Sequence, residues 1–256
     1  MKKKKVSLTY RVLKWILKTF YPKYTFEGAE NLPDEPCIIA GNHVQMHGPI
    51  VCEFYFPRER YTWCAGQMME LKEVPAYAFQ DFWAIRPKWT HWFYRILSYL
   101  IAPLSVCVFN NAYTIGVYHD TRVVSTFKKT VATLEEGYSV VIFPEHAKEY
   151  NHIVYDFQDK FIDVARTYYK RTGKELQFVP MYISPRLKKA YLGKPTRFSI
   201  DAPVNEERAR VRQYLMDGIT QIACDLPEHK VVPYINLPKR HHQSNKKVDN
   251  HEKTGC

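Results

Sequence analysis

Two short polar motifs in this 256-residue chain have the residue types needed for acid–base chemistry. The first is Asn42-His43, which follows the apolar run at 37–40, and the second is Phe143-Pro144-Glu145, at the end of the apolar run at 138–143. A neutral imidazole can accept a proton from a hydroxyl that attacks a carbonyl carbon, because it titrates near neutral pH. A lone histidine at the end of a strand more often makes a structural hydrogen bond. The chemical interpretation of His43 therefore depends on what the fold places beside it.

The two apolar runs are typical of buried parallel strands, and open α/β sheets bind ligands at the carboxyl ends of such strands. Strands and helices alternate along the chain, which predicts an α/β fold: a mostly parallel sheet flanked by helices, with an N-terminal basic amphipathic helix. The predicted strands are 24–27, 37–40, 114–118, 138–143, 178–183 and 190–198. The predicted helices are 48–56, 123–136, 156–171 and 205–224.

Length and composition favour one α/β domain at 24–237, preceded by a surface helix at 1–23 and followed by a disordered polar tail at 238–256. The chain shows no internal repeat. Six cysteines occur without a CxxC pair or a signal peptide, which argues against a disulfide framework and against secretion. We expect free thiols.

The order of the motifs resembles the glycerolipid (1-acyl-glycerol-3-phosphate, or lysophospholipid) acyltransferase family. The resemblance covers residues 6 to 225 and rests on the ordered set rather than on any single motif. The matching segments are Asn31-Leu32-Pro33, Asn42-His43, Pro49, Ile142-Phe143-Pro144-Glu145 and Phe178-Val179-Pro180-Met181. The resemblance implies transfer of a fatty acyl group from a thioester, acyl-CoA or acyl carrier protein as co-substrate, to the hydroxyl of a lysophospholipid or glycerol phosphate. No tightly bound cofactor is expected.

The same resemblance implies the roles of the site residues. His43 matches the catalytic histidine, with Asn42 beside it, and Phe143, Pro144 and Glu145 match a block whose glutamate helps to hold the acceptor's polar head. Where the family has an arginine that meets phosphate, this chain has His119, with Arg122 shortly after it.

Two positions depart from the family pattern. The motif H-x-x-x-x-D has Gly48 in place of the aspartate, and F-P-E-G has His146 in place of the glycine. Such an aspartate fixes the tautomer of the histidine and stabilises the imidazolium, so its loss favours a catalytically impaired member as an alternative. One hypothesis is that His47 or His146 takes up the space at Gly48, or that a carboxylate from elsewhere, such as Glu53 or Asp120, reaches His43. His43, His47 and His146 could together suggest a zinc site, but His43 is expected at a strand end rather than on the helix, so we predict no metal.

The charge of the chain predicts an anionic membrane surface as a partner. The formal net charge is +11, and a helix at 6–20 would carry an apolar stripe next to cations: Val6, Tyr10, Leu13, Leu17 and Phe20, beside Arg11, Lys14 and Lys18. The alternative is a helix packed on the core with solvated lysines. The longest apolar stretch, 96–109, is shorter than a bilayer crossing requires, and it suits a buried helix-to-strand passage or a shallow insertion. We therefore expect peripheral attachment at the cytoplasmic face of the cell membrane.

Interleaved aromatic and basic residues at 77–95 leave three interpretations open: a wall for the acyl chain, a belt at the headgroup level, or core packing. Such a pattern also suits single-stranded nucleic acid. However, the sequence has no RNP, KH or zinc-finger pattern, so we predict no nucleic-acid partner.

Overall fold

The computed structural model describes residues 6–246, and these form two compact units. The first contains Met1–Tyr21 and Tyr61–Lys129, and the second contains Pro22–Arg60 and Thr130–Cys256. Helix α5 (Val123–Glu135) begins in the first unit and ends in the second. The prediction of one domain at 24–237 therefore differs from the structure, because the chain leaves the second unit at residue 60 and returns to it at residue 130.

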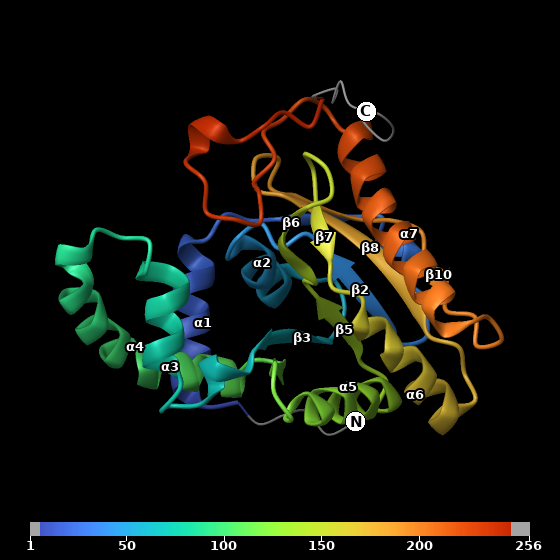
Figure 1. Ribbon diagram of the computed structural model, residues 1–256, viewed down its shortest axis with the longest axis horizontal. Coiled ribbons are helices and arrows are strands. Elements are labelled where there is room, and N and C mark those ends of the chain that lie inside the picture. Colours follow the sequence, from blue (N-terminus) through green and yellow to red (C-terminus); the bar gives the residue numbers. More distant parts are fainter. Residues whose placement is uncertain (1–5, 247–256) are drawn as a thin grey trace. The chain divides into compact units, whose positions relative to one another are not determined.

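The second unit is built on a mostly parallel sheet with the strand order β1-β9-β8-β2-β5. Figure 1 labels the strands β8, β2 and β5 of this sheet. The predicted α/β class is confirmed: β2 pairs in parallel with β5 and β8, and β1 pairs in parallel with β9. Strands β9 and β10 run antiparallel to β8. The strands are β1 (Thr25–Glu27), β2 (Cys37–Gly41), β5 (Ser139–Ile142), β8 (Gln177–Ser184), β9 (Lys189–Leu192) and β10 (Thr196–Arg197).

Burial explains why β2 and β5 form the centre of this sheet. Every residue of both strands is buried, and Ile38 and Ile39 stand in register with Val140 and Val141. A central strand forms hydrogen bonds with a neighbouring strand along each edge, and its side chains are buried on both faces of the sheet. A run of β-branched residues suits such a position. Helix α7 packs along β8 (Figure 1). The helices of this unit are η1 (Ala29–Asn31), α2 (His47–Tyr55), η5 (Lys160–Asp163), α6 (Val164–Thr172), α7 (Val204–Asp225) and η6 (Lys239–His241).

A second, two-stranded sheet corrects the predicted helix at 156–171. Strands β6 (Glu145–Glu149) and β7 (Tyr155–Phe157) pair antiparallel, and the helix begins only at Val164. All three residues of β7 are buried. This burial and the pairing with β6 are tertiary effects that override the local helical preference.

The predicted disordered tail at 238–256 is also corrected where the structure describes it. Asn245 is fully buried: its Oδ1 accepts from the backbone N–H of His229 at 2.7 Å, and its Nδ2 donates to the carbonyl of Ala223 at 2.8 Å. Lys230 and Ser244 form an antiparallel bridge that closes the segment between them. Residues 247–256 lie outside the described residues.

The first unit contains several helices and two parallel strands, β3 (Arg60–Ala65), whose first residue belongs to the second unit, and β4 (Thr114–Val117). Its helices are α1 (Leu8–Phe20), η2 (Gly66–Met69), α3 (Val74–Ala78), the π-helical η3 (Phe79–Trp83), η4 (Lys88–Thr90) and α4 (His91–Asn111). The expected helix-to-strand passage at 96–109 is wrong, because α4 is helical throughout.

The helical segment Lys88–Asn111 spans 24 residues and contains an 18-residue window with a mean hydropathy of 1.5, so by length and composition it could cross a membrane. Only 17% of its most apolar window is buried. The apolar helix is thus longer than residues 96–109, the stretch identified from the sequence.

The predicted apolar stripe of the N-terminal helix is buried in one part and exposed in another. Tyr10 is 5% exposed, and Val6 and Leu13 are half-buried, as the packed-helix alternative expects, whereas Leu17 and Phe20 are exposed. Lys2, Lys3, Lys4 and Lys5 lie outside the described residues.

Four cysteines, Cys37, Cys52, Cys64 and Cys107, are free thiols. Cys224 is disulfide-bonded, so the prediction of free thiols fails at that position.

Candidate functional site

The candidate site begins where β2 ends, in a loop that joins Gly41 to the start of α2 at His47. Asn42, the first residue of this loop, is buried, and its side-chain amide spans to β8: Oδ1 accepts from the N–H of Ile183 at 2.7 Å, and Nδ2 donates to its carbonyl at 3.1 Å. One residue thus continues the β2–β8 ladder with its side chain. Asn42 fixes the start of the loop, and substrate contact by Asn42 stays a prediction.

Glu145 joins the two predicted motifs within the second unit. One carboxylate oxygen accepts from the backbone N–H of His43 at 2.5 Å, and the other accepts from the N–H of Tyr155 at 2.9 Å. The side chain is 4% exposed, and burial raises its pKa to about 7 despite these two amides. Glu145 therefore positions the His43 loop. Its predicted contact with an acceptor headgroup stays a prediction.

The loop itself is conformationally strained. Val44 and Gln45 have φ of 43° and 59°, in the left-handed region that β-branched residues such as valine rarely adopt. Each such residue costs on the order of 1–3 kcal/mol, and strain of this kind collects at ligand sites. Two backbone hydrogen bonds hold the turn closed: His47 N–H to the carbonyl of Val44 at 3.2 Å, and Gly48 N–H to the carbonyl of His43 at 3.1 Å.

The His43 imidazole lies among aromatic rings. Phe143 and Tyr234 both meet it edge to face, with ring centroids 5.3 and 5.8 Å away. Burial lowers the pKa of the imidazole, which favours the neutral form that can accept a proton. Nδ1 is buried and has no hydrogen-bond partner within residues 6–246. The orienting carboxylate expected at that nitrogen is therefore not supplied by any residue in this range.

The atoms nearest to the space beside Gly48 belong to the backbone of His43 and to the ring of Phe143. A Cβ at this position would lie 2.6 Å from the carbonyl oxygen of His43 and 2.8 Å from Cε1 of the Phe143 ring. Glu53 instead pairs with Arg60 at 3.0 Å, and Asp120 pairs with Arg122 at 2.8 Å. The hypothesis that His47 or His146 takes up this space is therefore wrong, because the ring of Phe143 occupies it.

Gly48→Ala should destabilise the protein even though Gly48 lies in the first turn of α2, where alanine normally improves a helix. The new methyl group meets a backbone oxygen that can move only with the strained loop, and overpacking of this kind costs about 1–3 kcal/mol. The measurement is the midpoint of urea unfolding. A variant as stable as the wild type would show that the loop yields, and that aspartate could be restored at position 48.

His146 faces a different cluster. Its Nε2 lies 3.4 Å from Oδ2 of Asp156, a buried carboxylate that also accepts from the guanidinium of Arg212. Asp156 and Arg212 thus tie the β6–β7 hairpin to α7. His47 is half-buried at the start of α2, and burial lowers the pKa of its imidazole. Neither histidine supplies the missing aspartate, since Nδ1 of His43 has no partner within the described range.

His119 and Arg122, the predicted phosphate contacts, belong to the first unit. His119 is exposed. Arg122 pairs with Glu73 at 2.7 Å and Asp120 at 2.8 Å, and its guanidinium lies 4.0 Å from the centre of the Tyr118 ring. A phosphate at Arg122 would compete with these two carboxylates. Its binding there stays a prediction.

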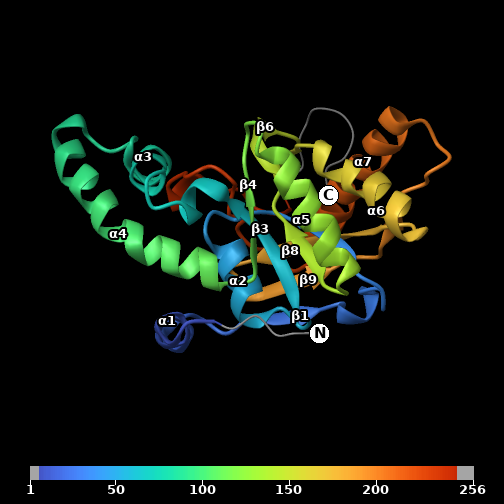
Figure 2. The ribbon, with the colours of Figure 1, turned by 90° about the horizontal axis from the view of Figure 1, so that it is seen from below.

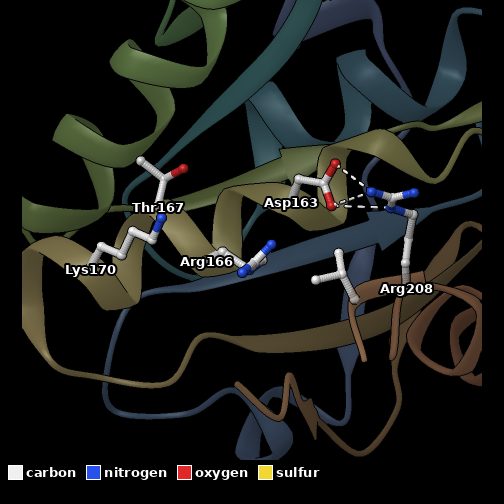
Figure 3. A pocket seen from close by; sticks show the side chains of 6 residues that line it. Asp163, Arg166, Thr167, Lys170 and Arg208 are labelled. Atoms are coloured by element: carbon white, nitrogen blue, oxygen red, sulfur yellow. Dashed lines mark hydrogen bonds and ion pairs between the residues drawn. The ribbon is translucent and has the colours of Figure 1, made fainter. Parts of the chain in front are cut away.

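A hollow of about 260 Å³ lies elsewhere in the second unit, between α6 and α7 (Figure 3). It is lined by Asp163, Arg166, Thr167, Lys170, Val204 and Arg208, and it contains none of the predicted site residues. The carboxylate of Asp163 pairs with Arg208 at 2.8 Å across the opening (Figure 3). The lining of this hollow contains no histidine, and its carboxylate, Asp163, is held in the ion pair with Arg208. We therefore place the candidate site at His43.

Sequence reasoning missed Tyr234, which meets both the His43 ring and the Tyr155 ring. The sequence feature that could have indicated Tyr234 is the short apolar stretch around it, at 231–237, just before the polar C-terminal residues. No group of three or more histidine, cysteine, aspartate or glutamate side chains that could hold a metal gathers in the part of the chain that the structure describes.

No family model matches this chain, and no curated protein matches it. Among solved structures, it is similar to the crystal structure of the 1-acyl-sn-glycerophosphate (LPA) acyltransferase, PlsC, from Thermotoga maritima. The identity is 15% and the TM-score is 0.44, over 83% of this chain and 79% of that chain. The α/β assignment itself rests on the sheet and helices described above.

Proposed function

We propose that this chain is an acyltransferase that moves a fatty acyl group from a thioester to the hydroxyl of a lysophospholipid or glycerol phosphate. The observation that supports it most is the joining of the two motifs: the carboxylate of Glu145 holds the backbone N–H of His43 at 2.5 Å. This contact sets the imidazole at the carboxyl end of a central parallel strand, the edge where such sheets bind ligands.

In the proposed reaction, neutral His43 accepts the proton of the acceptor hydroxyl as its oxygen attacks the thioester carbonyl carbon. The new C–O bond forms and the C–S bond breaks. The thiolate then leaves and takes the proton back from the imidazolium, so no covalent enzyme intermediate is required. Burial, which lowers the pKa of His43, keeps the base in its neutral form at neutral pH.

The substrates in this proposal are acyl-CoA or acyl carrier protein as donor and a lysophospholipid or glycerol phosphate as acceptor. The protein would work in phospholipid metabolism, at the cytoplasmic face of an anionic membrane as a peripheral protein.

Thiol release from acyl-CoA, measured with a panel of lysolipids and glycerol phosphate, tests the proposal. We expect acceptor-dependent release by the wild type and its loss in His43→Ala. Equal rates of thiol release by the two proteins, including no release by either, would contradict the assignment as an enzyme.

The pH dependence of kcat/KM tests whether His43 is the base. Burial lowers the pKa of this imidazole below its ordinary value of 6.5, so the acidic limb of the profile should lie below pH 6.5, with full activity above it. An acidic limb near pH 7 would instead report the carboxyl of Glu145, whose pKa burial raises to about 7. That result would contradict the assignment of the base to His43.

A second candidate is a protein that binds lipid or acyl chains without turnover. Two observations favour it: Nδ1 of His43 has no orienting partner within residues 6–246, and the ring of Tyr234 packs edge to face on the imidazole. In the serine-protease case, disabling the orienting carboxylate costs about 10⁴ in turnover. Saturable binding of a fluorescent lysolipid, together with no thiol release by wild type or His43→Ala, would favour this candidate.

A further inference from the structure

Helix α4 of the first unit has an inverted arrangement of side chains. Its buried stripe consists of the small residues Ser98, Ala102 and Ser105. Its exposed face consists of large apolar residues, among them Trp92 at 66% and Leu100 at 71% exposed; the others are Phe93, Ile96, Tyr99 and Leu104. A helix on a water-facing surface shows the opposite pattern, whereas small residues inside and large apolar residues outside are typical of helices in lipid.

Helix α1 adds a second apolar face next to α4 within the same unit. The two helices are in contact, and the backbone N–H of Ser7 donates to Oδ1 of Asn111 at the end of α4 at 2.7 Å. The exposed face of α1 consists of Leu8, Val12, Trp15, Ile16, Leu17 and Phe20. Arg11, Lys14 and Lys18 form a stripe beside this face, and the described part of α1 has no acidic residue.

We propose that the exposed faces of α1 and α4 form one docking surface for an anionic lipid bilayer. This surface is defined by the exposed residues of α1 and α4 named above. Apolar side chains enter the acyl region while the cations of α1 meet anionic headgroups, and the tryptophans lie at the boundary between them. The inference rests on the first unit alone and does not depend on catalysis at His43.

The contacts of α4 favour a helix that lies in one leaflet rather than one that crosses the bilayer. Helix α4 packs against η2, α3 and η3 of its own unit, and Figure 2 shows it as one long helix beside α3. The hydroxyl of Ser105 donates to the carbonyl of Met68 at 3.0 Å, and Ala102 joins the cluster of Met68, Val74 and Ala78. If α4 crossed the bilayer, it would lose these contacts. Helix α1 carries three cations, whose transfer into the bilayer centre would be costly.

Charge argues for lipid rather than a second copy of the chain. Two copies would bring Arg11, Lys14 and Lys18 of each α1 together, whereas anionic headgroups neutralise them. Arg95 is the one lysine, arginine, aspartate or glutamate within α4, so no acidic residue of these two helices offers a partner for the cations of a second α1.

Co-sedimentation with vesicles tests the surface. The wild type should bind phosphatidylcholine vesicles that contain phosphatidylglycerol, more weakly those without it, and less as salt is raised. Leu100→Glu should lower the partition coefficient by about tenfold or more. The matched control is Leu71→Glu, the same substitution at an exposed leucine in the turn between η2 and α3. We expect it to bind as the wild type does, and equal losses in both variants would overturn the proposal.

Two further measurements complete the test. Alkaline carbonate should release the bound protein, and its retention in the vesicle pellet would overturn the in-plane placement. Sedimentation velocity without lipid distinguishes the second-copy alternative: a dimer that Leu100→Glu dissociates, without vesicle binding, would contradict the lipid proposal. Thiol release with water-soluble glycerol phosphate as acceptor reports catalysis separately, so Leu100→Glu can lose vesicle binding while that turnover persists.

Discussion

His43→Ala lowers kcat/KM for acyl transfer by about 10² to 10⁴, the range that a positioned general base contributes. The reason is that the hydroxyl of the acceptor is a weak nucleophile and needs a base. The two other histidines of the predicted site lie elsewhere, since His146 pairs with Asp156 and His47 begins α2. Initial rates of thiol release at several acceptor concentrations give the measurement, and kcat should fall with little change in KM.

The control for this prediction is His47→Ala, since His47 is the nearest histidine in sequence to the loop. It should keep most of the activity. If His47→Ala loses as much as His43→Ala while both fold, the base would have to be reassigned or shared between them.

Glu145→Ala should have the largest effect on stability. It removes a buried carboxylate and leaves the backbone N–H groups of His43 and Tyr155 without their acceptors. Unsatisfied buried donors and the cavity together cost about 3 kcal/mol. In a chain of this size that corresponds to a fall in Tm of roughly 6–12 °C. The activity should fall as well, because the strained loop at Val44 and Gln45 loses its anchor.

The matched control is Glu149→Ala, at the exposed end of the same hairpin. It should change Tm by no more than about 2 °C, as exposed substitutions usually do. A Glu145→Ala protein as stable as Glu149→Ala would contradict the anchoring role.

The free energy of unfolding should depend on pH through the titration of Glu145. Its pKa in the folded protein is raised to about 7, so the folded state binds the proton more tightly than the unfolded state. This favours folding below the unfolded pKa, and the contribution is lost as pH rises through about 7. His43 acts in the opposite direction, because its lowered pKa destabilises the fold as pH falls below 6.5. Subtracting the Glu145→Ala profile from that of the wild type isolates the first effect.

The central strands were predictable from the sequence because their signal is local. Residues 37–40 form an apolar run bounded by Pro36 and Gly41, and only a strand buried on both faces suits such a run. The same holds for β5 and β8. The edge at which Asn42 and His43 lie followed from the rule that ligands bind at the carboxyl ends of parallel strands.

What the sequence could not show depends on contacts between distant residues. The helix predicted from 156 is a strand at Tyr155–Phe157 because it pairs with β6, and the ordered segment at 238–246 depends on Asn245 reaching residues 223 and 229. The space at Gly48 was expected to hold a polar group, but the ring of Phe143, 95 positions away in the chain, fills it. Spacing along the sequence contains no information about such a contact.

Mass spectrometry of the lipid product tests the central claim most directly. Wild-type protein incubated with a long-chain acyl-CoA and a lysophospholipid should form the acylated phospholipid in an amount equal to the thiol released, and His43→Ala should form almost none. Thiol release with free fatty acid as the only acyl product would show transfer to water, and no product at all would show a protein without turnover. Either result would contradict acyl transfer at His43.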